Sequence, residues 1–225
     1  MPENTAIEIK DGTLVIANSA FSGYRNLISV TIPNSVTIIG KRAFKDCSGL
    51  TSLPIGNGVT SIGEEAFYCC YGISSVTIPN SVTTIGENAF YCCHMTTVII
   101  PTSVTSIGDD AFCMCRNLTS VVSYIKEPFA TNSFYIYYDA TLYVPKGTYD
   151  KYKNTYSWNK YKTIKEIGDA NSDGNVDEMD MIAIANHIMG ETLEDFDEKA
   201  ADMNGDQKID VADIVELINQ LAPKD

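Results

Sequence analysis

The chain of 225 residues has only two histidines and one tryptophan, and its 16 Lys and Arg are outnumbered by 29 Asp and Glu. No segment forms the basic patch that nucleic-acid binding requires, so nucleic acid is an unlikely partner. No apolar run approaches the roughly 20 residues of a membrane-spanning helix. A signal peptide is also missing. Residues 1–4 run straight into a folded pattern, which indicates a trimmed N-terminus.

Motifs of enzymatic chemistry are absent as well. The sequence has no phosphate-binding glycine loop, no Gly-X-Ser-X-Gly and no paired carboxylates outside its acidic C-terminal segment. His94 follows Cys92 and Cys93, which suggests a Cys–His nucleophile. Adjacent residues rarely face each other, however, and no oxyanion site is recognisable, whereas His187 suits a structural role in a helix. We therefore predict that the chain is not an enzyme.

The negative charge is confined to one end of the chain. From residue 168 onward there are 16 Asp and Glu against 3 Lys and Arg, whereas residues 1–167 hold 13 of each class. Such local acidity indicates ion binding rather than a general means of staying soluble. Together with the length, it predicts two domains, residues 1–167 and 168–225.

The first domain repeats with a period of 22 to 23 residues. Each unit contains an Ala-Phe pair, with an Ile five residues before the Phe. This period is typical of a solenoid, in which stacked coils bury an apolar face that one coil cannot bury alone. The phenylalanines of the repeat are Phe21, Phe44, Phe67, Phe90 and Phe112, and a degenerate sixth unit ends at Phe134.

Local patterns predict the elements of each coil. Residues 30–32 and 76–78 alternate apolar and polar side chains as half-buried strands do, and Pro-Asn-Ser tripeptides then turn the chain. The acidic residue before Ala-Phe favours one short helical turn. Residues 7–16, with Asp-Gly at their centre, predict a hairpin over the N-terminal end. Residues 121–167 interrupt the repeat and predict a cap.

One cysteine stands three residues after the repeat Phe in four units. We predict that these residues, Cys47, Cys70, Cys93 and Cys115, form a ladder of buried thiols. Cys69 and Cys92 occupy another position in neighbouring units, where a disulfide is also conceivable. Zinc binding is disfavoured, because adjacent cysteines lack the usual spacing of zinc ligands.

Two features suggest ligand surfaces on the solenoid. Residues 135–161 are rich in tyrosine and contain Trp158. They form either a capping core, which we favour, or a platform for sugars. Thr37, Thr60, Thr83 and Thr105 recur at one position and would present a polar ladder. We expect a protein ligand.

The repeat resembles the BspA-like leucine-rich repeat family. The resemblance rests on Ile-Pro-Asn-Ser-Val-Thr-X-Ile-Gly-X-X-Ala-Phe-X-X-Cys, as at residues 78–93, and on the segment from Tyr143 to Trp158. It implies a β-rich, right-handed leucine-rich-repeat solenoid with a 23-residue period over residues 1–167, capped by 121–167. Such repeats mostly serve binding and adhesion.

Two acidic loops, residues 169–180 and 202–213, share one pattern (loop 1 and loop 2). Oxygen-bearing side chains fall at positions 1, 3, 5, 9 and 12 of both, and position 7 can offer a backbone carbonyl, which together form the oxygen cage that calcium prefers. Each loop precedes an apolar helix but lacks a helix before it, and position 12 is Asp rather than Glu. Position 6 is Gly174 in loop 1 but Gln207 in loop 2, so we expect loop 2 to be distorted or weaker, by about 1 kcal/mol.

These loop–helix units resemble the type I dockerin, which implies a small all-α module over residues 168–225 that binds two calcium ions. The module has few core residues and should need its ions to fold, so we expect chelation to unfold it and to leave the solenoid, with its separate core, intact. By the same resemblance, the ligands are Asp169, Asn171, Asp173, the Asn175 carbonyl, Asp177 through water and Asp180, followed by Asp202, Asn204, Asp206, the Lys208 carbonyl, Asp210 through water and Asp213.

Dockerins bind cohesin domains of scaffoldins in cellulosomes. Because the two halves differ at positions 10 and 11, we expect one binding orientation with an apolar interface dominated by the second half. We also expect the module to sit against the solenoid, because no Pro/Thr/Ser-rich linker separates them. The implied contacts are Glu178, Met179, Ile182, Ala183, Ala185 and Asn186, and then Val211, Ala212, Val215, Ile218 and Asn219.

The sequence therefore predicts a non-catalytic, secreted binding protein, extracellular and attached to a cellulosome or cell surface. Its partners would be a scaffoldin cohesin and an unknown solenoid ligand. The first alternative is an enzyme- or inhibitor-associated cellulosomal subunit with carbohydrate- or protease-related activity. The second is a calcium buffer or sensor.

Overall fold

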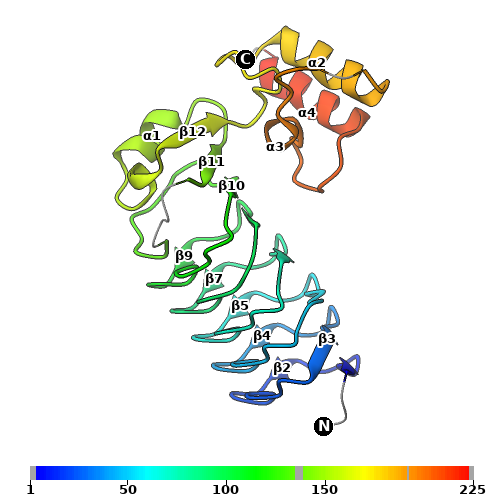
Figure 1. Ribbon diagram of the computed structural model, residues 1–225, viewed down its shortest axis with the longest axis vertical. Helices are drawn as coiled ribbons and strands as arrows, with labels where there is room; N and C mark the ends of the chain where they lie inside the picture. Colours follow the sequence, from blue (N-terminus) through cyan, green and yellow to red (C-terminus); the bar gives the residue numbers. More distant parts are fainter. Residues whose placement is uncertain (1–3, 135–138, 192, 223–225) are drawn as a thin grey trace.

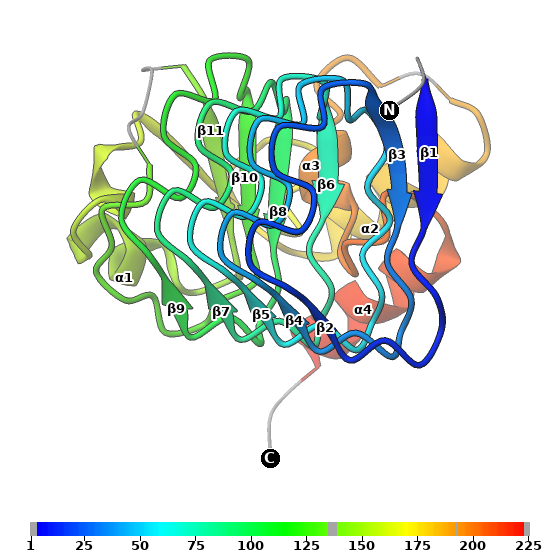
Figure 2. The same cartoon turned by 90° about the horizontal axis from the view of Figure 1, so that it is seen from below.

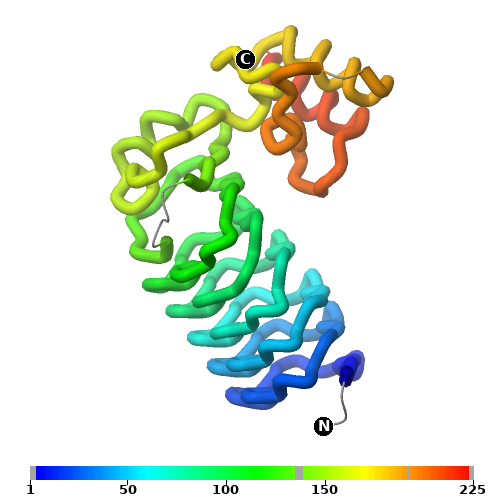
Figure 3. The backbone as a smooth tube through the Cα atoms, viewed as in Figure 1, coloured from blue at the N-terminus to red at the C-terminus, as the bar shows by residue number. Residues whose placement is uncertain are grey.

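A computed structural model describes residues 4–134, 139–191 and 193–222. It shows a stack of coils that begins at the N-terminus and ends in a small helical module, as Figures 1 and 3 show. No helix within the described ranges is long and apolar enough to cross a membrane. The predicted solenoid is confirmed.

Two parallel sheets run along the stack, because equivalent residues of successive coils pair with one another (Figure 2). The first is formed by very short strands: β2 (Val15–Ile16), β4 (Ile38–Ile39), β5 (Ser61–Ile62), β7 (Thr84–Ile85) and β9 (Ser106–Ile107). The second contains β6 (Ser75–Thr77), β8 (Thr97–Ile100), β10 (Ser120–Ser123), β11 (Thr141–Val144) and β12 (Thr163–Glu166). A separate pair joins β1 (Thr5–Glu8) to β3 (Leu27–Thr31).

The repeat phenylalanines form one continuous stack inside the solenoid. Phe67, fully buried, lies 5.3 Å from Phe44 and 5.2 Å from Phe90 between ring centroids, with nearly parallel planes. The stack continues to Phe134, which lies 5.1 Å from Phe112. The 23-residue period therefore places identical rings in register.

The predicted ladder of buried thiols is confirmed, and every cysteine of the chain is a free thiol. Each ladder thiol donates to a carbonyl of the preceding coil, as Cys70 does to Phe44 O at 3.1 Å. Burial raises the pKa of Cys47 to about 11 and that of Cys115 to about 12. These thiols therefore stay protonated and serve packing.

The threonine ladder also bonds within the solenoid. Thr60 Oγ1 donates to Thr37 O at 3.1 Å, and Thr83 Oγ1 donates to Thr60 O at 3.2 Å. The hydroxyl protons are thus used between coils, although the side chains are exposed. The ladder supports the stack and has fewer donors for a ligand than the sequence suggests.

Two local predictions were wrong. Residues 7–16 do not form a hairpin, because β1 pairs in parallel with β3 while β2 pairs in parallel with β4. They form the first coil, with Gly12 in its turn at φ +86°. The segments before and after Ala-Phe are tight turns rather than helical turns, since residues such as Arg42 and Asp46 adopt φ near +58°.

Residues 121–167 cap the stack and also extend its second sheet through β11 and β12. Helix α1 (Tyr149–Asn154) and the 3-10 turn η1 (Trp158–Lys160) bring Tyr152 and Trp158 over the last coil. Trp158 is fully buried, lies 5.2 Å from Phe134 and donates to Phe129 O at 2.9 Å. The capping interpretation therefore holds for these side chains, whereas Tyr135, Tyr137 and Tyr138 lie outside the described residues.

Within its described residues, the C-terminal module contains three helices, α2 (Glu178–Ile188), α3 (Glu198–Ala201) and α4 (Val211–Leu221). Because α3 ends directly before loop 2, the expectation that this loop lacks a helix before it was wrong. It packs directly against the end of the solenoid, as expected without a linker (Figure 1). Its core is not separate, however. Val122 and Tyr143 of the second sheet are buried in the same cluster as Ile184, Met203 and Leu217. The main cluster of the solenoid contains none of the module's described residues, so the expectation of separate cores was wrong only for the module.

Candidate calcium loops and exposed helix faces

The last residue of each acidic loop lies in the first turn of a helix, where it has two tasks. Asp177 caps α2, and the carboxylate of Asp180 accepts from Asp177 N at 2.9 Å. Asp210 and Asp213 repeat this capping box at α4, again at 2.9 Å. Reciprocal capping satisfies backbone donors that a helix leaves unpaired. It also turns the position-12 carboxylates back toward their loops.

Both loops wrap their backbone amides around the first aspartate. Asp169 accepts from Gly174 N at 3.2 Å, and Asp202 accepts from Gln207 N at 3.0 Å and from Gly205 N at 2.8 Å. The position-3 asparagines, Asn171 and Asn204, accept from the position-5 amides at 3.0 and 2.8 Å. The position-5 aspartates, Asp173 and Asp206, accept from the amides of Asn175 and Lys208. The two loops thus share one folded form.

The position-12 carboxylates are fully buried without a basic partner. Asp180 and Asp213 have no exposed surface, and no described ion pair involves either. Burial raises the pKa of Asp169, Asp180 and Asp202 from the ordinary value for this side chain. Buried carboxylates of this kind are normally paired with a cation or coordinate a metal. The loops therefore fit a hard divalent cation.

Carboxylates alone do not form the cage. Within the described residues, no three His, Cys, Asp or Glu side chains are gathered in a way that would hold a metal. Asparagine amides and backbone carbonyls complete the oxygen set that calcium takes. The predicted ligands Asn171, Asn175, Asn204 and Lys208 would supply these additional oxygens.

The loops differ in where glycine stands. Positions 4 and 6 have positive φ in both: Ser172 (+59°) and Gly174 (+89°) in loop 1, Gly205 (+76°) and Gln207 (+67°) in loop 2. The expectation that position 6 needs the left-handed conformation is confirmed. Loop 2 adopts it with a side chain that is unfavourable there by about 1 kcal/mol relative to glycine.

The solenoid bonds to the module through side chains that sequence reasoning did not single out. Tyr124 Oη donates to Asp202 O at 3.0 Å, and Tyr143 Oη donates to Asp197, which caps α3. Lys165 Nζ pairs with the same Asp197 at 2.6 Å, and Lys146 Nζ donates to Val176 O at 2.7 Å. The missing linker predicted the contact, and the exchanged glycines of the two loops were a further sequence signal of it.

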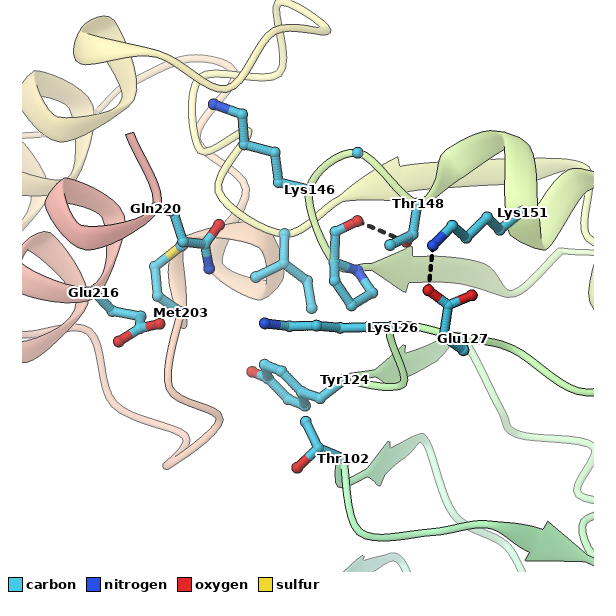
Figure 4. Close-up of a pocket in the computed structure, with 13 residues that line it drawn as sticks. Thr102, Tyr124, Lys126, Glu127, Lys146, Thr148, Lys151, Met203, Glu216 and Gln220 are labelled. Atoms are coloured by element: carbon cyan, nitrogen blue, oxygen red, sulfur yellow. Dashed lines mark hydrogen bonds and ion pairs between the residues drawn. The ribbon is translucent and has the colours of Figure 1, made fainter. Parts of the chain in front are cut away.

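A cleft of about 610 Å³ lies between the two parts of the chain (Figure 4). Tyr124 and Lys126 extend into it from the solenoid side, and Glu216 and Gln220 of α4 lie opposite. Met203 is in its wall and is almost fully buried. A second cleft of about 420 Å³ lies beside loop 2 and is lined by Thr77, Tyr124 and Gly205, so the interface is hollowed there as well as beside α4.

Apolar side chains remain exposed on α2 and α4 after this packing. Met179 keeps 56% of its surface, and Val211 keeps 62%. Ile182, Val215 and Ile218 are each about half exposed. The implied contact residues Glu178, Ala212 and Asn219 are also exposed, Ala185 and Asn186 are half-buried, and Ala183 is buried in the module's own core.

Residues 3–119 match the BspA-type leucine-rich repeat region in six copies. The chain belongs to this leucine-rich repeat family. Residues 167–222 of the repeat protein match the dockerin type I domain. Both are non-catalytic types of module. No curated protein matches the chain.

Solved structures of bacterial leucine-rich repeat proteins resemble this family member. The leucine-rich repeat protein of T. pallidum is 24% identical, with a TM-score of 0.53 over 80% of this chain and 82% of its own. One from Bacteroides ovatus is 20% identical, with a TM-score of 0.49 over 72% of this chain and 63% of its own. The first likeness supports the fold alone.

Proposed function

We propose that the dockerin binds a scaffoldin cohesin in a calcium-dependent manner and so attaches an extracellular, non-catalytic repeat protein to a cellulosome or cell surface. Two calcium ions would be held by the predicted ligands of loops 1 and 2. The observation that carries this proposal is the exposure of both apolar helix faces while the dockerin is packed on the solenoid. An assembly module needs that free face, whereas a calcium buffer does not.

The exposed faces also favour one binding orientation. Rotating the dockerin by half a turn would exchange Glu178 with Val211 and Met179 with Ala212. A carboxylate would then occupy an apolar site in the cohesin, which is costly when it is unpaired. The second half presents Val211, Val215 and Ile218 at helical spacing, and we propose it as the dominant face.

The test measures binding to a cohesin of the same organism by calorimetry, with and without chelator. Ala212→Asp should weaken binding by at least tenfold because it buries a charge in the interface, and Met179→Asp should have a much smaller effect. Lys199→Asp is the matched control, because Lys199 is exposed and belongs to α3 rather than to the apolar faces of α2 and α4. If each single variant binds normally and only the double variant fails, both orientations are used.

For the solenoid, we propose a protein ligand, as leucine-rich repeats generally take. Trp158 is fully buried, so it does not take part in the alternative platform for sugars. Within the described part of this segment, residues 139–161, Tyr149 and Tyr156 remain exposed and could stack on a sugar. Retention on insoluble polysaccharide that disappears in a Tyr149→Ala, Tyr156→Ala double variant would favour the sugar platform instead.

A further inference from the structure

Loop 2 of the dockerin contacts the solenoid at positions 4 and 6, two of the positions where its sequence departs from loop 1. At position 4, loop 1 has Ser172 and loop 2 has Gly205. A Cβ atom on Gly205 would lie 2.9 Å from the Tyr124 ring, closer than real Cβ contacts come. The glycine therefore leaves room for the aromatic ring of the solenoid.

The same tyrosine also bonds to the start of the loop. Tyr124 Oη donates to the carbonyl of Asp202, the position-1 residue, at 3.0 Å. Asp202 in turn accepts from the amides of Gly205, Asp206 and Gln207. The phenol thus fixes the residue around which the loop wraps.

At position 6, the side chain of Gln207 leaves the loop and bonds to the solenoid. Its Nε2 donates to Thr77 Oγ1 on β6 at 2.9 Å, across 130 residues of sequence. Gly174 occupies this position in loop 1 and has no side chain to make such a bond. A hydrogen bond of this kind contributes about as much as the glutamine loses through its positive φ.

We propose that the solenoid is a positioning surface for the second calcium loop. Tyr124 and Thr77 hold loop 2 in its ion-binding form and offset the missing glycine at position 6. The inference rests on the calcium sites proposed above and adds a linkage: calcium binding to loop 2 and packing of the dockerin on the solenoid stabilise each other. Loop 2 then keeps the folded form of loop 1 despite Gln207, because its support comes from outside the dockerin.

The experiment follows each loop separately in the full-length, isotope-labelled chain by NMR during a calcium titration. The amides of Gly174 and Gln207 donate to the first aspartate of their own loops, so each reports one site. Thr77→Val and Tyr124→Phe each remove one solenoid hydrogen bond. Thr102→Val is the matched control: this exposed threonine lines the same cleft, and no hydrogen bond from its side chain to loop 2 occurs in the described structure.

Thr77→Val and Tyr124→Phe should each raise the calcium midpoint at Gln207, the free calcium concentration at which its amide signal has shifted halfway, by about fivefold. This factor is the equivalent of one hydrogen bond. The midpoint at the Gly174 amide should stay unchanged. Thr102→Val should change neither midpoint. In a Gln207→Gly background, Thr77→Val should have no further effect, which a general loss of stability would not reproduce. An unchanged Gln207 midpoint in both variants, or equal shifts at both loops, would overturn the linkage. Failure of either wild-type amide to respond to calcium would instead overturn the proposed sites themselves.

Discussion

Phenylalanines in the middle of the ring stack should contribute more to the stability of the solenoid than the phenylalanine at its N-terminal end. Phe67 is fully buried between two parallel rings. Phe67→Ala would leave a cavity and remove the ring that stacks on Phe44 and Phe90. We expect it to lower the free energy of unfolding by about 3–5 kcal/mol. For a unit of this size, such a loss lowers the melting temperature by about 6–20 °C.

Phe21→Ala is the matched control, because Phe21 is only partly buried. It stacks on Phe44 at 5.1 Å and meets Tyr24 edge-on at 6.2 Å. In a solenoid each coil contacts only its neighbours, so this variant should fray the first coil and leave the main transition nearly in place. Calorimetry of both variants makes the comparison, and hydrogen exchange locates the fraying. Equal losses at the two positions would refute the view that the interior of the stack carries the stability.

Two further predictions concern ions and protons. Chelation should unfold the dockerin. It should also weaken protection from hydrogen exchange in β10 and β11, because Val122 and Tyr143 of these strands share the dockerin's core. Unchanged exchange in both strands would contradict the shared core. Arg42 and Lys45 lower the pKa of Glu65 from its ordinary value to about 2. The ionised carboxylate therefore stabilises the solenoid above about pH 4.5, and this stabilisation is lost as the pH falls toward 2. Glu65→Gln should therefore destabilise the solenoid by about 1–2 kcal/mol at pH 7, with the difference from wild type shrinking in acid, as urea unfolding at both pH values would show.

Periodic features were predictable because each depends on one coil and its repetition. The repeat position of Phe90 was enough to predict the solenoid, and that of Cys93 was enough to predict the thiol ladder. The N-terminal segment was not, because an Asp-Gly turn between apolar residues is equally compatible with a hairpin and with a coil. Pairing with β3 and β4, rather than any local preference, decides between them.

The sequence by itself determined the solenoid, the two acidic loops and the helices that follow them, since these rest on short-range spacing. Tertiary structure alone decided that Tyr124, Tyr143 and Thr77 meet the dockerin. It also decided that Ala183 is turned inward while Met179 and Val211 stay exposed. The contacts with the dockerin join residues 54 to 130 positions apart and leave no periodic trace in the sequence. In loop 2 their sequence signal is limited to Gly205 and Gln207, and the structure explains both residues by their contacts with the solenoid.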